Sequence, residues 1–385
     1  MSRLALAVAL ILAASTGACT GPKLDLTGSG AGPITGSGGD PNLSQPIVLG
    51  GQLYAKYCAL CHGDNAEGYK ADNAPSLVNP EFLVSASDEF LRSSIGRGRP
   101  GTAMAGYAKA IGGPLDDASV RAIVAFLRKD APAPRALPAV SGGDPVLGKA
   151  TYTGMCASCH GTLERRGEAI WLANPQFVAT AAPAFLAHGI KAGRPGTKMI
   201  PWGNSLGDAE VANLVAYIQS WPKAGQAVAP VDPTPRPLGP IVINPDGKAP
   251  TFTLREDRFV PAAQVKAALD AKQRLVIIDS RAPSDWLHTR IPGAISIPHY
   301  DMKAIDQVPN DGTWVLAYCA CPHHASGIVV DELRKRGYKN TAVIDEGILG
   351  WQRAGYPAVD AEGKPAVMPP ALPPEPPAAL QPGPQ

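Results

Sequence analysis

The sequence predicts a multidomain fold, with two small all-α domains followed by an α/β domain that has a parallel sheet. A pentapeptide of the form Cys-x-x-Cys-His occurs twice, each time inside similar flanking sequence. Amphipathic helical patterns surround both copies. The last third of the chain instead carries short continuous apolar runs, which are typical of strands buried on both faces of a parallel sheet.

The composition is that of a globular chain with long irregular connections. Its 385 residues, 45% hydrophobic and 18% charged, are enough for two or three small domains. The 41 glycines and 40 prolines predict irregular segments between the compact parts. The formal net charge is only +2 and no basic block stands out, which argues against a nucleic-acid partner.

The first 18 residues have the pattern of a secretory signal peptide. Arg3 precedes an apolar run that is short for a bilayer span and ends in small residues. Cys19 follows directly, in a setting that resembles the lipobox of bacterial lipoproteins; a plain cleaved signal with a leftover cysteine is the alternative. We expect lipidation at Cys19, export to the periplasmic face of a bacterial membrane, and a flexible tether over residues 19–45.

The two pentapeptides predict covalent attachment of two haem c groups. In each of them two thiols would bond the porphyrin vinyl groups, and the adjoining His62 or His160 would present an imidazole to the iron. A zinc knuckle and a redox-active Cys-x-x-Cys pair are the alternatives. The four thiols are those of Cys58, Cys61, Cys156 and Cys159.

A second repeated segment supplies candidates for the sixth iron ligand. Residues 98–104 and 193–199 both read Gly-Arg-Pro-Gly-Thr-x-Met, which indicates an internal duplication. Met104 and Met199 end these loops, where a thioether can be presented to iron; loop packing is the alternative. Ligation by His and Met suits the transfer of single electrons. His188 is expected to be a surface or packing residue.

Amphipathic helices begin and end each copy. The spacing of Leu49, Leu53 and Tyr57 predicts one buried face of the first helix, and the helices after Asp116 and Asp208 close the two copies. With these helices in place, residues 46–130 and 143–222 resemble tandem class I cytochrome c domains. The resemblance implies the axial pairs His62 with Met104 and His160 with Met199, and it implies redox proteins as partners.

The remainder of the chain reads as a linker, an α/β domain and a tail. Residues 223–250 and 361–385 are rich in Pro with Gly or Ala, which predicts a linker and a disordered tail. Between them we expect strands at 275–279, 313–318 and 341–344, with helices near 262–271 and 327–336.

Four motifs in this region resemble, in order and spacing, those of the rhodanese-like (sulfurtransferase) domain, over residues 252–360. They are Ile278–Arg281, Arg290–Pro298, Tyr318–Cys319 and Asp345–Trp351. The resemblance implies transfer of sulfane sulfur through a persulfide on Cys319. The loop after Cys319 is one residue longer than the usual pattern and lacks its arginine.

Three interpretations of this loop remain open. Cys319 is the nucleophile of a sulfur-transfer site, or the loop is a soft-metal or dithiol site, or it is an idle binding module. The residues of the second interpretation are Cys319, Cys321, His323 and His324. The sequence thus predicts a dihaem electron carrier, with a sulfurtransferase or persulfide-oxidising enzyme as the alternative and a small sulfur compound as a further partner.

Overall fold

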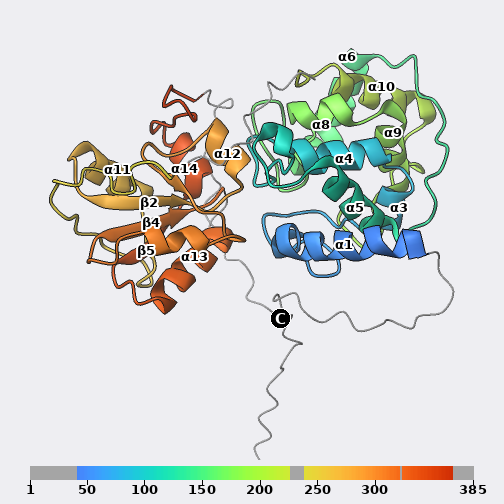
Figure 1. The fold of residues 1–385 in the computed structure, drawn as a ribbon. Coiled ribbons are helices and arrows are strands. Elements are labelled where there is room, and N and C mark those ends of the chain that lie inside the picture. Colours follow the sequence, from blue (N-terminus) through green and yellow to red (C-terminus); the bar gives the residue numbers. More distant parts are fainter. Residues whose placement is uncertain (1–40, 226–237, 321–322, 367–385) are drawn as a thin grey trace, which may run out of the picture. The chain divides into compact units, whose positions relative to one another are not determined.

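The computed structural model describes residues 41–225, 238–320 and 323–366. The signal peptide, Cys19 and Cys321 lie outside these ranges. Figure 1 shows helices alone in the first part of the described chain and a sheet with helices in the second. The expected fold class is confirmed. None of the helices in the described ranges is both long and apolar enough to cross a bilayer.

The first copy of the repeat is built from short helices around the Cys-x-x-Cys-His segment. They are α1 (Pro41–Tyr57), α2 (Ala59–His62), α3 (Pro80–Leu83), α4 (Asp88–Arg97), the 3₁₀ turn η1 (Lys109–Ile111) and α5 (Asp117–Arg128). As expected, Asp116 caps α5, where its carboxylate accepts a hydrogen bond from the amide of Ser119 at 2.9 Å. The tether was expected to end at residue 45. Helix α1 begins earlier, at Pro41, so the last residues of the expected tether are helical.

The second copy repeats this order. Its helices are α6 (Pro145–Met155), α7 (Ala157–His160), α8 (Pro175–Thr180), α9 (Pro183–Ala192) and α10 (Asp208–Gln219). Helix α10 opens at Asp208, as expected, with the Glu210 carboxylate accepting the amide of Gly207 at 2.7 Å. An acidic first turn complements the helix dipole in both closing helices.

A glycine lets the first and last helices of each copy pack at close range. A methyl group added at Gly50 would lie 1.9 Å from the carbonyl oxygen of Ala122 on α5, and one at Gly148 would lie 2.0 Å from that of Asn213 on α10. The buried faces therefore contain Gly50 and Gly148, and of the residues expected on the buried face of α1, Leu53 and Tyr57 pack against the core. Leu49 is 44% exposed, which corrects its assignment to the buried face of α1.

The two copies share one hydrophobic core. Four phenylalanines from the two copies meet in it. The ring centroids of Phe90 and Phe185 are 4.7 Å apart, those of Phe90 and Phe177 are 6.1 Å apart, and those of Phe82 and Phe185 are 6.2 Å apart. Aromatic pairs at these distances are stabilising beyond the area they bury. The duplicated segments therefore fold against one another.

The second part is a parallel five-stranded sheet with helices on both faces. The strand order is β1-β5-β4-β2-β3, and every neighbouring pair is parallel. Its elements are β1 (Phe259–Val260), α11 (Ala262–Asp270), β2 (Leu275–Asp279), α12 (Pro283–His288), β3 (Ile295–Ser296), η2 (Lys303–Gln307), β4 (Trp314–Tyr318), α13 (His324–Lys335), β5 (Thr341–Ile344) and α14 (Gly347–Arg353). The three expected strands are β2, β4 and β5.

The core of this part has two layers. Helix α13 covers one face of the sheet, and α11 and α14 cover the other (Figure 1). In β2 the alternation sends Val276 and Ile278 to the α13 face, and Leu275 and Ile277 to the opposite face. All four side chains are fully buried, which explains why the strand reads as a continuous apolar run.

Candidate functional site

Each Cys-x-x-Cys-His segment is a single helical turn fixed to the helix before it. The Tyr54 hydroxyl on α1 donates to the carbonyl oxygen of Gly63 at 2.6 Å. In the second copy, the Tyr152 hydroxyl on α6 donates to that of Gly161 at 2.9 Å. Both tyrosines are almost fully buried, at 1% and 2% exposure. The paired bonds hold both pentapeptides in the same place relative to their helices.

The histidines of the two segments are oriented in the same way. The Nδ1 atom of His62 lies 2.8 Å from the carbonyl oxygen of Pro75, and that of His160 lies 2.8 Å from the carbonyl oxygen of Ile170. Burial lowers the pKa of both imidazoles and so favours the neutral form. A ring anchored at Nδ1 by a carbonyl is the usual arrangement for a histidine that binds a metal through Nε2.

The four thiols are not equally covered. Cys58, Cys61 and Cys156 are partly buried, whereas Cys159 is exposed. Burial raises the pKa of Cys58 and Cys61 to about 12 and that of Cys156 to about 11. Paired thiols beside an oriented imidazole fit a covalently attached haem, because the donor set is the one that such a group requires.

The two methionine loops have the same internal hydrogen bonds. In the first copy the amide of Arg99 donates to the carbonyl oxygen of Met104 at 2.8 Å, and the amide of Met104 donates to the Thr102 hydroxyl at 3.1 Å. In the second copy the corresponding bonds join Arg194, Thr197 and Met199, also at 2.8 and 3.1 Å. Each methionine therefore ends a closed and defined loop.

The first methionine loop leads back to its own haem-attachment segment. Tyr107, three residues after Met104, donates through its hydroxyl to the carbonyl oxygen of Tyr57 at 3.1 Å, and the two rings lie 5.8 Å apart. Tyr57 immediately precedes Cys58. In the second copy Trp202 occupies the position of Tyr107 and packs, with Cys156, against the shared core.

Cys319 lies at the carboxyl end of the sheet, between β4 and α13. Its side chain is 2% exposed, and its sulfur lies 3.3 Å from the hydroxyl of Ser326 in the first turn of α13. Leu60 and Ala103 pack against Cys319 and Ala325. The expected position, after a strand and before a helix, is therefore the one observed.

The histidines near Cys319 make other contacts. The Nε2 atom of His323 lies 2.6 Å from Oδ1 of Asp345, and its ring lies 4.1 Å from that of Phe259. No group of three or more His, Cys, Asp or Glu side chains suited to a metal occurs within the part of the chain that the structure describes. His188 pairs with Glu81 at 2.7 Å, which is the packing role expected for it.

Two family models match the chain. The model described as cytochrome c oxidase, cbb3-type, subunit III matches residues 46–127 and 143–218, and the model of the rhodanese-like domain matches residues 261–354. The chain carries tandem cytochrome c domains and a rhodanese-like domain. Cytochrome c domains carry covalently bound haem c and exchange electrons with redox protein partners.

Several known proteins are similar to parts of the chain. The cbb3-type cytochrome c oxidase subunit CcoP of Rubrivivax gelatinosus is 32% identical over 130 residues, which are 34% of this chain and 39% of that protein. The dihydro-heme d1 dehydrogenase of Pseudomonas aeruginosa is 40% identical over 83 residues, 22% of this chain and 15% of that protein. A thiosulfate sulfurtransferase structure from Pseudomonas aeruginosa is 27% identical over 28% of this chain and 21% of that chain, with a TM-score of 0.26. The chain therefore spans less than half the length of each of these proteins.

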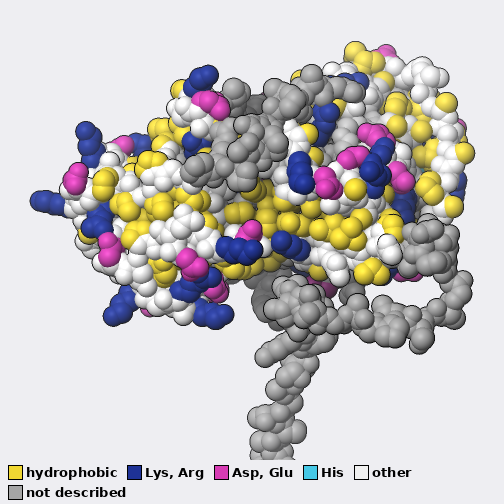
Figure 2. All heavy atoms as spheres, in the orientation of Figure 1, with side chains coloured by type: hydrophobic (Ala, Val, Ile, Leu, Met, Phe, Trp, Pro, Cys, Tyr) yellow, Lys and Arg dark blue, Asp and Glu magenta, His cyan; other side chains and the backbone are white. Residues whose placement is uncertain are grey.

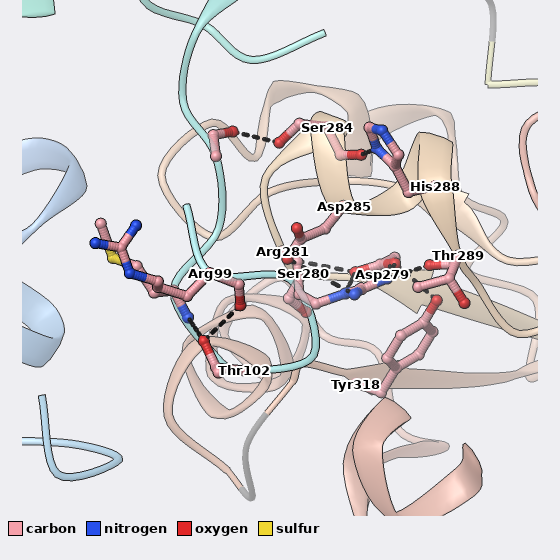
Figure 3. Close-up of polar contacts among 12 residues, drawn as sticks. Arg99, Thr102, Asp279, Ser280, Arg281, Ser284, Asp285, His288, Thr289 and Tyr318 are labelled. Atoms are coloured by element: carbon pink, nitrogen blue, oxygen red, sulfur yellow. Dashed lines mark hydrogen bonds and ion pairs between the residues drawn. The ribbon is translucent and has the colours of Figure 1, made fainter. Parts of the chain in front are cut away.

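The rhodanese-like domain contains a buried ionic network whose partners the sequence did not predict. Arg281 donates to both carboxylate oxygens of Asp279, at 3.0 and 2.7 Å, and the Tyr318 hydroxyl donates to Asp279 at 2.7 Å (Figure 3). Although burial alone would lower the pKa of Arg281, the Asp279 carboxylate outweighs it and raises that pKa. The Ser284 hydroxyl nearby donates to the carbonyl oxygen of Gly106.

Proposed function

We propose that this protein is an exported dihaem cytochrome c that transfers single electrons, and that Cys319 couples this transfer to the oxidation of a small sulfur compound. Cys58, Cys61, His62 and Met104 hold the first haem. Cys156, Cys159, His160 and Met199 hold the second. Haem c supplies a one-electron donor and acceptor at each of these places.

The observation that carries the coupling is the packing around Cys319 and Ala325. Leu60 lies between the two cysteines of the first attachment segment, and Ala103 immediately precedes Met104. Both side chains pack against the small cluster that Cys319 forms with Ala325. The cluster that contains the proposed nucleophile therefore packs against the two segments proposed to hold the first haem, which favours this haem as the acceptor of electrons from sulfur.

The chemistry of this coupling balances with two haems. The Cys319 thiolate and a hydrosulfide ion form one S–S bond and yield a persulfide, one proton and two electrons. Two one-electron centres take up two electrons. The terminal sulfur of the persulfide then passes to an acceptor thiolate, which regenerates the Cys319 thiolate without further redox change. We infer that hydrosulfide is the class of substrate.

A Cys319→Ser variant tests the proposal. Oxidised full-length protein is mixed anaerobically with sulfide, and haem reduction is followed by absorbance. We expect the rate to fall to that of direct reduction by sulfide, while reduction by ascorbate stays unchanged because the haem sites are intact. Equal rates for the variant and the natural protein would leave the electron-transfer function without its coupling to sulfur.

Sulfur transfer without electron transfer is the second candidate function. The contact between Cys319 and Ser326 at the start of α13 favours it, because helix amides and a hydroxyl stabilise a thiolate or persulfide anion. The usual arginine is absent from the loop, so we expect little activity with thiosulfate. Formation of thiocyanate from thiosulfate and cyanide at a high rate, without haem reduction, would favour this candidate.

Export and anchoring are proposed from residues outside the described ranges. The apolar run before Cys19, and the small residues next to it, support a lipoprotein signal and a periplasmic location. A pyridine haemochrome spectrum, together with the mass of the mature protein, tests this part. We expect two haem groups and a lipidated Cys19 at the amino terminus. A mature chain that begins elsewhere would exclude the anchor.

A further inference from the structure

The two cytochrome c domains exchange reciprocal hydrogen bonds at their methionine loops. The side-chain amide of Asn79, at the start of α3, donates to the carbonyl oxygen of Pro195 at 2.9 Å. The side-chain amide of Asn174, at the start of α8, donates to that of Pro100 at 2.9 Å. Pro100 and Pro195 belong to the loops that end in Met104 and Met199. Each asparagine therefore contacts the methionine loop of the other domain.

Each asparagine also caps its own helix. The Oδ1 atom of Asn79 accepts from the amide of Phe82 at 3.2 Å, and that of Asn174 accepts from the amides of Gln176 and Phe177 at 3.1 and 3.2 Å. The side chains are 7% and 1% exposed. Leaving a buried amide group without a hydrogen-bond partner costs free energy, so these bonds restrain the position of each loop.

The surrounding contacts repeat the same exchange. His188 pairs with Glu81 at 2.7 Å, and at the corresponding positions Gln176 donates to Ser93 at 3.3 Å. The guanidinium of each methionine loop lies over one phenylalanine ring of its own domain and one of the other. These pairs are Arg99 with Phe90 and Phe177, and Arg194 with Phe185 and Phe82. The interface is therefore an approximate twofold one, with a methionine loop on each side.

We propose that Asn79 positions Met199 for the second haem and that Asn174 positions Met104 for the first. This inference rests on the proposed ligation of the two haems. The loops are short and closed by the bond from Arg99 to Met104, or from Arg194 to Met199, so a shift at the proline moves the methionine. Each domain thereby stabilises the axial ligand of the other, and the two haems are coupled through their polypeptide surroundings.

Asparagine-to-aspartate substitutions separate the two roles of these side chains. Asn79→Asp keeps the oxygen that caps α3 and removes the donor to Pro195. The measurement uses oxidised full-length holoprotein and its far-red sulfur-to-iron band, with Met104→Lys and Met199→Lys as references that assign each haem's share. For Asn79→Asp we expect the ratio of methionine-bound to methionine-free second haem to fall about tenfold. The midpoint potential of the second haem falls as well, and the band and potential of the first haem stay unchanged.

The reciprocal variant and a matched control complete the test. Asn174→Asp affects the first haem alone, and Asn79→Ser repeats the result of Asn79→Asp without a new charge. The control is Ser87→Ala, which removes the hydroxyl that caps α4 by accepting from the Phe90 amide at 3.1 Å. It removes no bond between the domains, so both haems should keep their band.

Other patterns overturn the proposal. They are an effect of Asn79→Asp on the first haem, an equal effect on both haems, or no effect on either. If the natural protein itself lacks the far-red band, methionine ligation fails before any substitution is made, and the proposed haem ligation fails with it. Failure of the positioning role alone is seen only in the variants.

Discussion

The cytochrome c domains and the rhodanese-like domain bury their apolar residues to different extents. In the described residues, all large hydrophobic side chains that are more than one-third exposed lie in the cytochrome c domains; they are Val48, Leu49, Tyr69, Val78, Val146, Leu147, Met155, Ile170 and Ile200. The sheet of the rhodanese-like domain instead has residues at 0% exposure, among them Leu275, Ile277 and Leu316. Figure 2 shows side chains of both charge signs interspersed on one face of the molecule.

Three of these exposed side chains lie next to proposed ligands of the second haem. Met155 precedes Cys156, the carbonyl of Ile170 binds His160, and Ile200 follows Met199, so these exposed apolar residues adjoin the proposed ligands of the second haem. A porphyrin is a large apolar surface, and burying such side chains against it is favourable. We therefore expect haem to be a structural part of the cytochrome c domains.

Loss of haem attachment should give the largest effect. In a Cys58→Ala/Cys61→Ala variant we expect the cytochrome c domains to lose more than about 4 kcal/mol of stability, because a bound group is missing from the shared core. The rhodanese-like domain keeps its transition. Calorimetry and helical circular dichroism of the full chain measure both parts. Unchanged melting of the helical part would contradict the comparison.

Breaking the buried ion pair should affect only the rhodanese-like domain. Asp279→Asn leaves Arg281, 8% exposed, without its main partner, and the expected loss is about 3–5 kcal/mol. Urea unfolding of the rhodanese-like domain, followed by the loss of its sheet structure, measures this loss of stability. Asp270→Asn is the matched control, since its pair with Lys266 is on the surface and should cost less than about 1 kcal/mol. A comparable loss in the control would refute the role of burial.

The glycine contacts should be equally sensitive in the two copies. Gly50→Ala and Gly148→Ala each place a methyl group against a backbone carbonyl, and we expect a loss of about 1–3 kcal/mol in either. Gly154→Ala, also in α6, has no atom within 4 Å of the added methyl and should be neutral or stabilising. Thermal unfolding of holoprotein compares the three. A loss confined to one copy would show that the duplication is not structurally equivalent.

The smallest effect expected is a pH dependence of the rhodanese-like domain. Burial alone would raise the pKa of Asp345, but bonds to Arg255 and His323, at 2.9 and 2.6 Å, outweigh it and lower that pKa. The ionised Asp345 carboxylate therefore contributes to the stability of the folded domain. This contribution is present above the unfolded pKa of about 3.9 and is lost as pH falls through the lower, folded pKa. We expect less than about 1 kcal/mol. Asp345→Asn should abolish it in acid titrations of stability, and a persistent slope would assign it elsewhere.

Local patterns in the sequence predicted much of this structure. The runs at 275–279 and 341–344 coincide with β2 and β5 because strands buried on both faces need apolar residues at every position. Strands β1 and β3 are only two residues long, too short for a periodic signal. The assignment of Leu49 to the buried face of α1 was wrong, because apolar spacing cannot show that the neighbouring Gly50 makes the close contact with α5.

The positions of the candidate site residues were less visible in the sequence than their identities. The Cys, His and Met residues were identified from repeated motifs, whereas the carbonyls that orient His62 and His160 carry no sequence signal. The bonds from Asn79 and Asn174 join residues far apart in the chain. Such contacts depend on how the two copies pack, and no local pattern encodes them.

The shared phenylalanine cluster has a consequence for inheritance. Phe82 and Phe90 of one copy pack against Phe177 and Phe185 of the other, so neither copy would retain a complete interior if separated. Once duplication had joined the halves in this way, deletion or exchange of either one would expose the interior of its neighbour. Selection would then act on the pair as a single heritable module.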